Sequence, residues 1–170
     1  KARNLDELRQ DIEKVQTLLA GNHRLNLHEI YGEFGGKFVD RDQVEVSHFQ
    51  GWIDWAKEHN LKLDFNSTSF SHPKSGDLSL ANPDKSIRDF WIEHTKRCRR
   101  IADAMGKAQG DPCIMNIWVH DGSKDLTVER YRYRQILKES LDEILAEDLP
   151  HMKSCLEAKL FGIGLEAYTV

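Results

Sequence analysis

The sequence has 170 residues, of which 39% are hydrophobic, so the chain can bury the core of one ordinary domain. Its formal net charge of −4 and its lack of a long cluster of lysine and arginine argue against binding to nucleic acid or to an anionic membrane, and favour a small neutral or polar ligand. Three cysteines in separate apolar contexts argue against a disulfide framework, and we expect buried thiols in a soluble, cytoplasmic protein.

Helical and β-type patterns alternate along the chain. The first expected helix, at about 4–19, begins at Asn4, which can cap it because Glu7 follows three residues later. Further helices are expected at 47–59, from Asp84 toward Gly106 and Gly110, and from about 127 to just before Pro150. Short β-type runs between the helices predict strands at 24–31, 61–66, 113–119 and 155–161.

Strands that alternate with long helices predict parallel strands joined by crossover helices. We therefore expect an α/β fold, a partial (β/α)8 TIM barrel of about four consecutive β/α units, with residues 1–170 forming a single domain from the central part of the barrel. The first helix has no strand before it and the last strand has no helix after it, so we expect truncation at both ends. An open doubly wound sheet is the alternative, but the sequence lacks the Gly-rich phosphate turn that such folds often carry.

Each expected strand has two sets of side chains, because alternate residues point to opposite faces. One set is apolar and should pack beneath helices: Leu25, Leu27, Leu61, Leu63, Phe65, Met115, Ile117, Val119, Leu156, Ala158 and Leu160. The other set is Asn26, His28, Asp64, Asn66, Asn116, Trp118, Glu157 and Lys159. Polar groups are costly to bury without partners, so this inward face predicts a ligand, a metal or a network among the side chains themselves.

The pair Glu157 and Lys159 is the most specific feature of the polar set. Its i, i+2 spacing on a strand aims a carboxylate and an ammonium into the same space, which suits a metal ion beside a sugar oxygen. A simple buried ion pair without a metal is the alternative. On periodicity alone Trp118 is equally a core residue or a substrate wall, and a single histidine such as His28 at a strand end is more often structural than catalytic.

Several short stretches resemble the L-rhamnose isomerase family, within the xylose-isomerase-like barrels. In chain order they are RLNLH at 24–28, LDFN at 63–66, FSHP at 70–73, MNIW at 115–118, LEAKL at 156–160 and KLFGIG at 159–164. They occur in the order found in the family, and the resemblance extends over essentially the whole chain.

This resemblance implies an aldose-ketose isomerase that interconverts L-rhamnose and L-rhamnulose by a metal-assisted hydride shift. The metal would be Mn²⁺, with a second divalent ion such as Zn²⁺, Mg²⁺ or Co²⁺, and the protein would be a homo-oligomer, a tetramer. The implied roles are Glu157 as a metal ligand, Lys159 as a catalytic residue at the sugar O1, and His28 as a catalytic acid or base in ring opening. We expect Trp118, Phe65 and Asn66 to contact the substrate.

The family's remaining metal ligands, a histidine and several aspartates, belong to later strands that this sequence does not contain. We therefore expect the 170-residue chain to be inactive alone, with its active site completed by parts of a longer parent. The alternatives are another sugar isomerase or epimerase of the same barrel superfamily, or a non-catalytic barrel segment. The sequence leaves His72 open between a solvated loop and the pocket rim, and it places Asp121 in a solvated turn.

Overall fold

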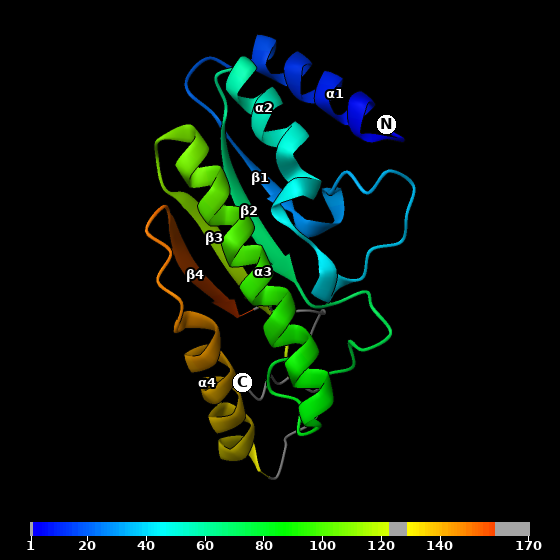
Figure 1. Ribbon diagram of the computed structural model, residues 1–170, viewed down its shortest axis with the longest axis vertical. Helices are drawn as coiled ribbons and strands as arrows, with labels where there is room; N and C mark the ends of the chain where they lie inside the picture. Colours follow the sequence, from blue (N-terminus) through cyan, green and yellow to red (C-terminus); the bar gives the residue numbers. More distant parts are fainter. Residues whose placement is uncertain (1, 123–128, 159–170) are drawn as a thin grey trace.

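The computed structural model describes residues 2–122 and 129–158 (Figure 1). The helices are α1 (Leu5–Leu18), α2 (Gln50–Glu58), α3 (Lys85–Gln109) and α4 (Arg130–Leu145), with short 3-10 helices η1 (Glu29–Tyr31), η2 (Arg41–Gln43) and η3 (Val46–Phe49). The strands are β1 (Arg24–His28), β2 (Lys62–Thr68), β3 (Cys113–Val119) and β4 (Met152–Ala158). Within these residues no helix is long and apolar enough to cross a membrane.

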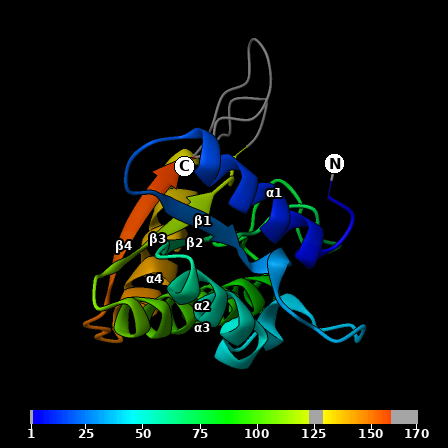
Figure 2. The same ribbon diagram turned by 90° about the horizontal axis from the view of Figure 1, so that it is seen from above.

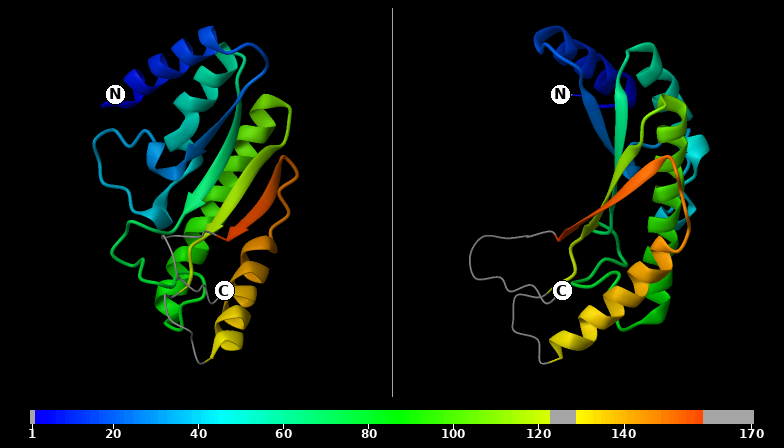
Figure 3. Two further views of the ribbon diagram at one scale, coloured as in Figure 1. Left: turned by 180° about the vertical axis from the view of Figure 1, so that it is seen from behind. Right: turned by 90° about the vertical axis from the view of Figure 1, so that its left-hand side faces the viewer.

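The four strands form one parallel sheet in the order β1-β2-β3-β4. Crossovers between parallel strands are right-handed. Because each strand joins the sheet on the same side of the strand before it, the helices that connect the strands lie on one face of the sheet. Figures 2 and 3 show α2, α3 and α4 along that face, with α1 beside β1 at the edge of the sheet, while the opposite face of β2, β3 and β4 carries no helix from the described residues. A doubly wound sheet has helices on both faces, so the arrangement confirms the predicted barrel segment.

Local sequence explains where the helices begin and end. Asn4 caps α1, because its side chain accepts a hydrogen bond of 2.9 Å from the Glu7 backbone N–H, as predicted. Asp84 caps α3 in the same way through Ser86, and α3 ends where Gly110 adopts a φ of 64°. The helix expected at 47–59 is divided into η3 and α2.

Boundaries of three strands differ from the prediction. The second strand runs from Lys62 to Thr68 instead of from 61 to 66. The first strand ends at His28, where the chain turns into η1 instead of continuing to residue 31. The last strand begins at Met152, three residues before the predicted start at Cys155, and the predicted end at 159–161 lies outside the described residues. The predicted beginning of the fourth helix, at about 127, also lies outside them.

The core lies between the sheet and the helices α2 and α3. Its largest fully buried side chains include Trp52, Trp91, Phe49, Phe65 and Met115. Cys98 and Cys113 are buried, as predicted.

Two side chains of β4 depart from the expected burial. Cys155 is exposed, because alternation places it on the helix-free face together with Glu157. Leu156 is 59% exposed although its register partner Ile117 is 2% exposed, because β4 is the edge of the described sheet. The predictions of a buried Cys155 thiol and of Leu156 packed beneath a helix were therefore wrong.

Candidate functional site

The helix-free face gathers polar side chains near the carboxyl ends of the strands. Register pairing aligns His28, Asn66 and Asn116 in one row across β1, β2 and β3. The next row pairs Trp118 of β3 with Glu157 of β4. The structure thus brings four of the predicted site residues onto one surface: His28, Asn66, Trp118 and Glu157. Lys159 and Leu160 lie outside the described residues.

A chain of amide hydrogen bonds orients His28. The Asn26 Nδ2 group donates to Asn66 Oδ1 at 3.3 Å, and this leaves Asn66 Nδ2 directed at His28 Nε2, 3.1 Å away. An amide nitrogen can only donate, so Nε2 accepts, and the neutral imidazole carries its proton on Nδ1. His28 Nε2 is therefore the hydrogen-bond acceptor of this pair, and it lies at the polar face.

Glu157 is oriented from the neighbouring strand. The Asn116 Nδ2 group donates to Glu157 Oε2 at 2.5 Å, which fixes one carboxylate oxygen and the plane of the group. Glu157 itself is exposed on the polar face. Across the described ranges, no three His, Cys, Asp or Glu side chains lie close enough to hold a metal ion. The carboxylate of Glu157 fits one position of an oxygen-rich metal site and does not form such a site by itself.

Aromatic rings border the His28 imidazole. The Trp118 ring centroid lies 5.9 Å from that of His28, and Tyr31 meets His28 edge-on at 6.2 Å. Phe70, from the loop after β2, stands edge-on to Trp118 at 5.2 Å. These rings give the polar face an apolar border. Neither Tyr31 nor Phe70 was predicted as a site residue, since the strand pattern does not reveal which loop side chains turn toward the sheet.

Phe65 is not part of this surface. It is fully buried on the helix side of β2, where its ring lies edge-on to Phe49 at 5.1 Å. Neighbouring residues of a strand point to opposite faces, so Asn66 on the polar face requires Phe65 on the other. Phe65 therefore does not face the surface shared by His28, Asn66, Trp118 and Glu157, and the structure gives no support to its predicted contact with the substrate.

His72 and Asp121 are both structural. His72 stacks on Phe90 of α3 at 5.0 Å, and its Nε2 lies 3.0 Å from the Asp40 carboxylate, so it is a packed and hydrogen-bonded residue and not a solvated one. Asp121 was predicted in a solvated turn, yet it is buried. Its carboxylate accepts hydrogen bonds from the backbone N–H groups of Ser79 and Ala81, which anchor the loop after β2.

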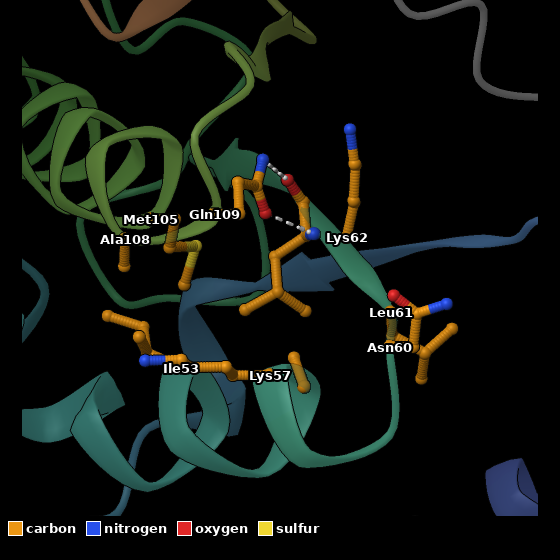
Figure 4. A pocket seen from close by; sticks show the side chains of 10 residues that line it. Ile53, Lys57, Asn60, Leu61, Lys62, Met105, Ala108 and Gln109 are labelled. Carbon is orange, nitrogen blue, oxygen red and sulfur yellow. Dashed lines mark hydrogen bonds between the residues drawn. The ribbon is translucent and has the colours of Figure 1, made fainter.

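A separate pocket of about 230 Å³ lies at the opposite end of the sheet, between α2, the start of β2 and the end of α3 (Figure 4). There the Gln109 side chain bonds both backbone groups of Leu63, its Oε1 accepting at 2.7 Å and its Nε2 donating at 3.1 Å. The amino-terminal side of a barrel serves stability, and active sites lie at the carboxyl ends of the strands. The polar face is therefore the better candidate site.

A parallel sheet with helices on one face, and with polar and aromatic side chains at the carboxyl ends on the other, defines part of a (β/α)-barrel enzyme. The chain matches the L-rhamnose isomerase (RhaA) family over residues 1–170 and belongs to that family.

Three relatives illustrate the relationship. The chain is 72% identical over 170 residues to the L-rhamnose isomerase of Bacteroides thetaiotaomicron, covering 100% of this chain and 41% of the relative. It is 53% identical over 173 residues to that of Rhodopirellula baltica (100% and 40% covered) and 51% identical over 172 residues to that of Mannheimia succiniciproducens (100% and 41%). The chain thus spans about 40% of the length of these relatives.

Proposed function

We propose that this chain is part of a metal-dependent aldose-ketose isomerase that interconverts L-rhamnose and L-rhamnulose. One observation carries the proposal: in a chain that matches the L-rhamnose isomerase family throughout, His28, Trp118 and Glu157 share the polar face at the carboxyl ends of the strands. The rest of the active site would come from parts of the relatives' length that this chain does not span.

His28 would act as the acid or base of ring opening. Its Nε2 is directed into the polar face and already accepts one hydrogen bond, from Asn66, so a sugar hydroxyl can replace the amide as the donor there. Asn66 would bind the sugar through the same amide. Lys159, which lies outside the described residues, would contact the sugar at O1.

Trp118 would form an apolar wall for the substrate. Its ring, with Phe70 edge-on to it, borders the polar groups without adding charge. Aromatic rings pack well against the C–H groups of a sugar, and L-rhamnose, a 6-deoxy sugar, presents a methyl group in place of a hydroxyl. The wall would therefore favour a deoxy sugar over its hydroxylated counterpart.

The metal would be Mn²⁺, with a second divalent ion such as Zn²⁺, Mg²⁺ or Co²⁺. Glu157 would supply one carboxylate ligand, held in orientation by Asn116, and oxygen ligands suit hard cations. When bound, such an ion polarises the sugar oxygens and so assists the hydride shift. The further ligands would come from outside this chain.

The cellular setting is also part of the proposal. Cys98, Cys113 and Cys155 are all free thiols, which agrees with a reducing compartment, and we propose a cytoplasmic homo-oligomer, a tetramer. Light scattering on the full-length protein tests the tetramer.

Two substitutions in the full-length protein test the function. Glu157→Gln should lower both bound Mn²⁺ and L-rhamnulose formation, because an amide replaces the carboxylate ligand. His28→Asn should keep the metal and lower kcat about 10²- to 10⁴-fold, as for loss of a general acid or base. Metal analysis and a ketose assay measure both. Glu93→Gln is the matched control, because this carboxylate pairs with Arg97 on the far side of α3.

Two results would contradict the proposal. Unchanged metal content and activity in Glu157→Gln would remove the metal assignment. Comparable turnover of many aldoses by the unsubstituted protein would replace L-rhamnose isomerase with a broader sugar isomerase of the same barrel type.

A further inference from the structure

A buried carboxylate directly follows the candidate base His28. Glu29 is the first residue of η1, and it is 0% exposed. Because its side chain is completely buried, it does not line the surface at which a sugar would bind. A charge in such a position is costly unless it is fully paired, so the carboxylate requires partners.

The partners of Glu29 come from two other segments. The Thr68 backbone N–H, at the end of β2, donates to Glu29 Oε2 at 3.1 Å. The Thr68 hydroxyl and the Arg41 guanidinium of η2 both donate to Glu29 Oε1 through short hydrogen bonds. Arg41 Nη1 also donates to the Thr68 carbonyl at 3.1 Å. The carboxylate therefore joins the ends of β1 and β2 to the loop that follows β1.

His94 adds α3 to the same junction. It is fully buried, and its Nδ1 lies 2.9 Å from the Arg41 carbonyl oxygen while its Nε2 lies 3.1 Å from that of Thr68. Whichever nitrogen carries the proton donates to one of these two carbonyls. We call Glu29, Arg41, Thr68 and His94 the Glu29 cluster.

The Glu29 cluster lies next to both rings of the candidate site. Glu29 is bonded in sequence to His28, and Thr68 is the register partner of Trp118. One ring thus belongs to the residue before Glu29 and the other to the residue beside Thr68 on the neighbouring strand, and the two ring centroids are 5.9 Å apart. We propose that the Glu29 cluster is a positioning device that fixes the spacing between the His28 imidazole and the Trp118 ring. In its catalytic consequence, this inference rests on the function proposed above.

Positioning explains the cluster better than stability does. Apolar residues of similar volume commonly stabilise a protein as well as a buried ion pair does, so the pair is a weak device for stability. The hydrogen bonds of the Glu29 cluster are directional, however, and several of them have Thr68 as donor or acceptor. A displacement of about 1 Å in a catalytic group is enough to lower a rate about 100-fold.

Thr68→Val in the full-length protein is the sharpest test. It removes the hydroxyl that donates to Glu29 while keeping the size of the side chain and leaving both charges of the ion pair in place. Glu29→Ala would leave the Arg41 guanidinium without its carboxylate partner and could prevent folding. We expect Thr68→Val to lower kcat for L-rhamnose about 10- to 100-fold with little change in KM. Thr68→Ser, which keeps the hydroxyl, should restore kcat.

Thr95→Val is the matched control. Thr95 is also buried, but its hydroxyl donates to the Trp91 carbonyl within α3 at 2.9 Å, away from the cluster. It should leave kcat unchanged. Equal losses in Thr68→Val and Thr95→Val would show a general packing effect and would overturn the positioning role.

Crystal structures of the same full-length variants give a readout that does not depend on activity. The ring spacing of His28 and Trp118 should change by about 0.5 Å or more in Thr68→Val and stay unchanged in Thr95→Val. An unchanged spacing in a folded Thr68→Val protein would overturn the inference. If the unsubstituted protein forms no L-rhamnulose, the proposed function is wrong. The spacing of the His28 and Trp118 rings still tests the positioning role of the Glu29 cluster in that case.

Discussion

The three cysteines lie in two different environments. Burial raises the pKa of Cys98 well above its usual value and raises that of Cys113 to about 12, so both stay protonated near neutral pH. Cys155 is exposed on the polar face. Because the thiolate is the reactive form, we expect iodoacetamide to label Cys155 first in the folded chain, and the other two only after unfolding. Peptide mapping by mass spectrometry measures this, and equal labelling of all three would contradict the assigned burial.

Gly106 illustrates a constraint set by a close approach. The helix predicted to run toward Gly106 and Gly110 continues through Gly106 and ends at Gln109, with Gly110 as its cap. A Cβ at Gly106 would collide with the His151 backbone carbonyl, just before β4. The glycine therefore allows the chain to pass close to α3.

We expect Gly106→Ala to lower the free energy of unfolding by about 1–3 kcal/mol, as for overpacking, despite the better helix propensity of alanine. Urea unfolding of the chain measures the change. Lys107→Ala, at the next and exposed position, should have little effect. A stabilised Gly106→Ala protein would show that the His151 segment can move aside.

Alternation along strands predicted most of the candidate site at the residue scale. It placed His28, Asn66, Trp118 and Glu157 on one face. The same rule places Phe65 on the opposite face, so the predicted contact of Phe65 with the substrate was inconsistent with alternation. Glu29 directly follows β1 and is buried, where a carboxylate needs partners.

Those partners could not be predicted from the sequence. Arg41 lies in the short 3-10 helix η2 and His94 in α3, and no periodic pattern relates either of them to β1. Phe70 was missed for the same reason. Pairings that depend on loop conformation follow from the tertiary fold and not from local propensity.

Arg99 connects three elements. It lies on α3 and is only 5% exposed, and its guanidinium donates to the carbonyls of Ile144 and Glu147 at the end of α4. Its Nε also donates to Ser154 in β4 at 3.2 Å. The last carbonyls of a helix have no partners within the helix, so Arg99 satisfies groups that α4 leaves open.

We expect Arg99→Met to lower the free energy of unfolding by about 2–4 kcal/mol, through lost hydrogen bonds from a charged donor. Arg100→Met is the matched control. That neighbour is paired with Glu147 at the surface, and exposed ion pairs contribute about 0–1 kcal/mol. Equal effects of the two substitutions in urea unfolding would show that the contacts with α4 carry little energy.

At the scale of elements, the caps and periodic patterns were sufficient for the helices and for the middle of each strand. The start of β4 was misplaced by three residues, because Lys153 and Cys155 face the open polar side and break the apolar pattern of a buried strand. Nothing local distinguishes a barrel segment from a doubly wound sheet. That distinction comes from the strand order, which is a property of the whole sheet.

At the scale of the whole molecule, the described sheet has an open face and two edge strands, β1 and β4. At the amino-terminal end of the sheet, Arg24 of β1 forms ion pairs with Asp64 of β2 and with Asp111, just before β3. The carboxyl end carries the candidate site. The exposed Leu156 indicates that the edge at β4 has a surface suited to a further packed element.

We expect the 170-residue chain alone to form no measurable L-rhamnulose. One carboxylate cannot hold a catalytic ion, and within residues 2–122 and 129–158 no cluster of three potential ligands accompanies Glu157. Adding a separately expressed polypeptide that covers the rest of the relatives' length should restore Mn²⁺ binding and activity together, because the ligands and the open sheet edge would be completed in the same step. A ketose assay with and without that polypeptide measures this, and metal-dependent turnover by the chain alone would mean that it carries a complete site.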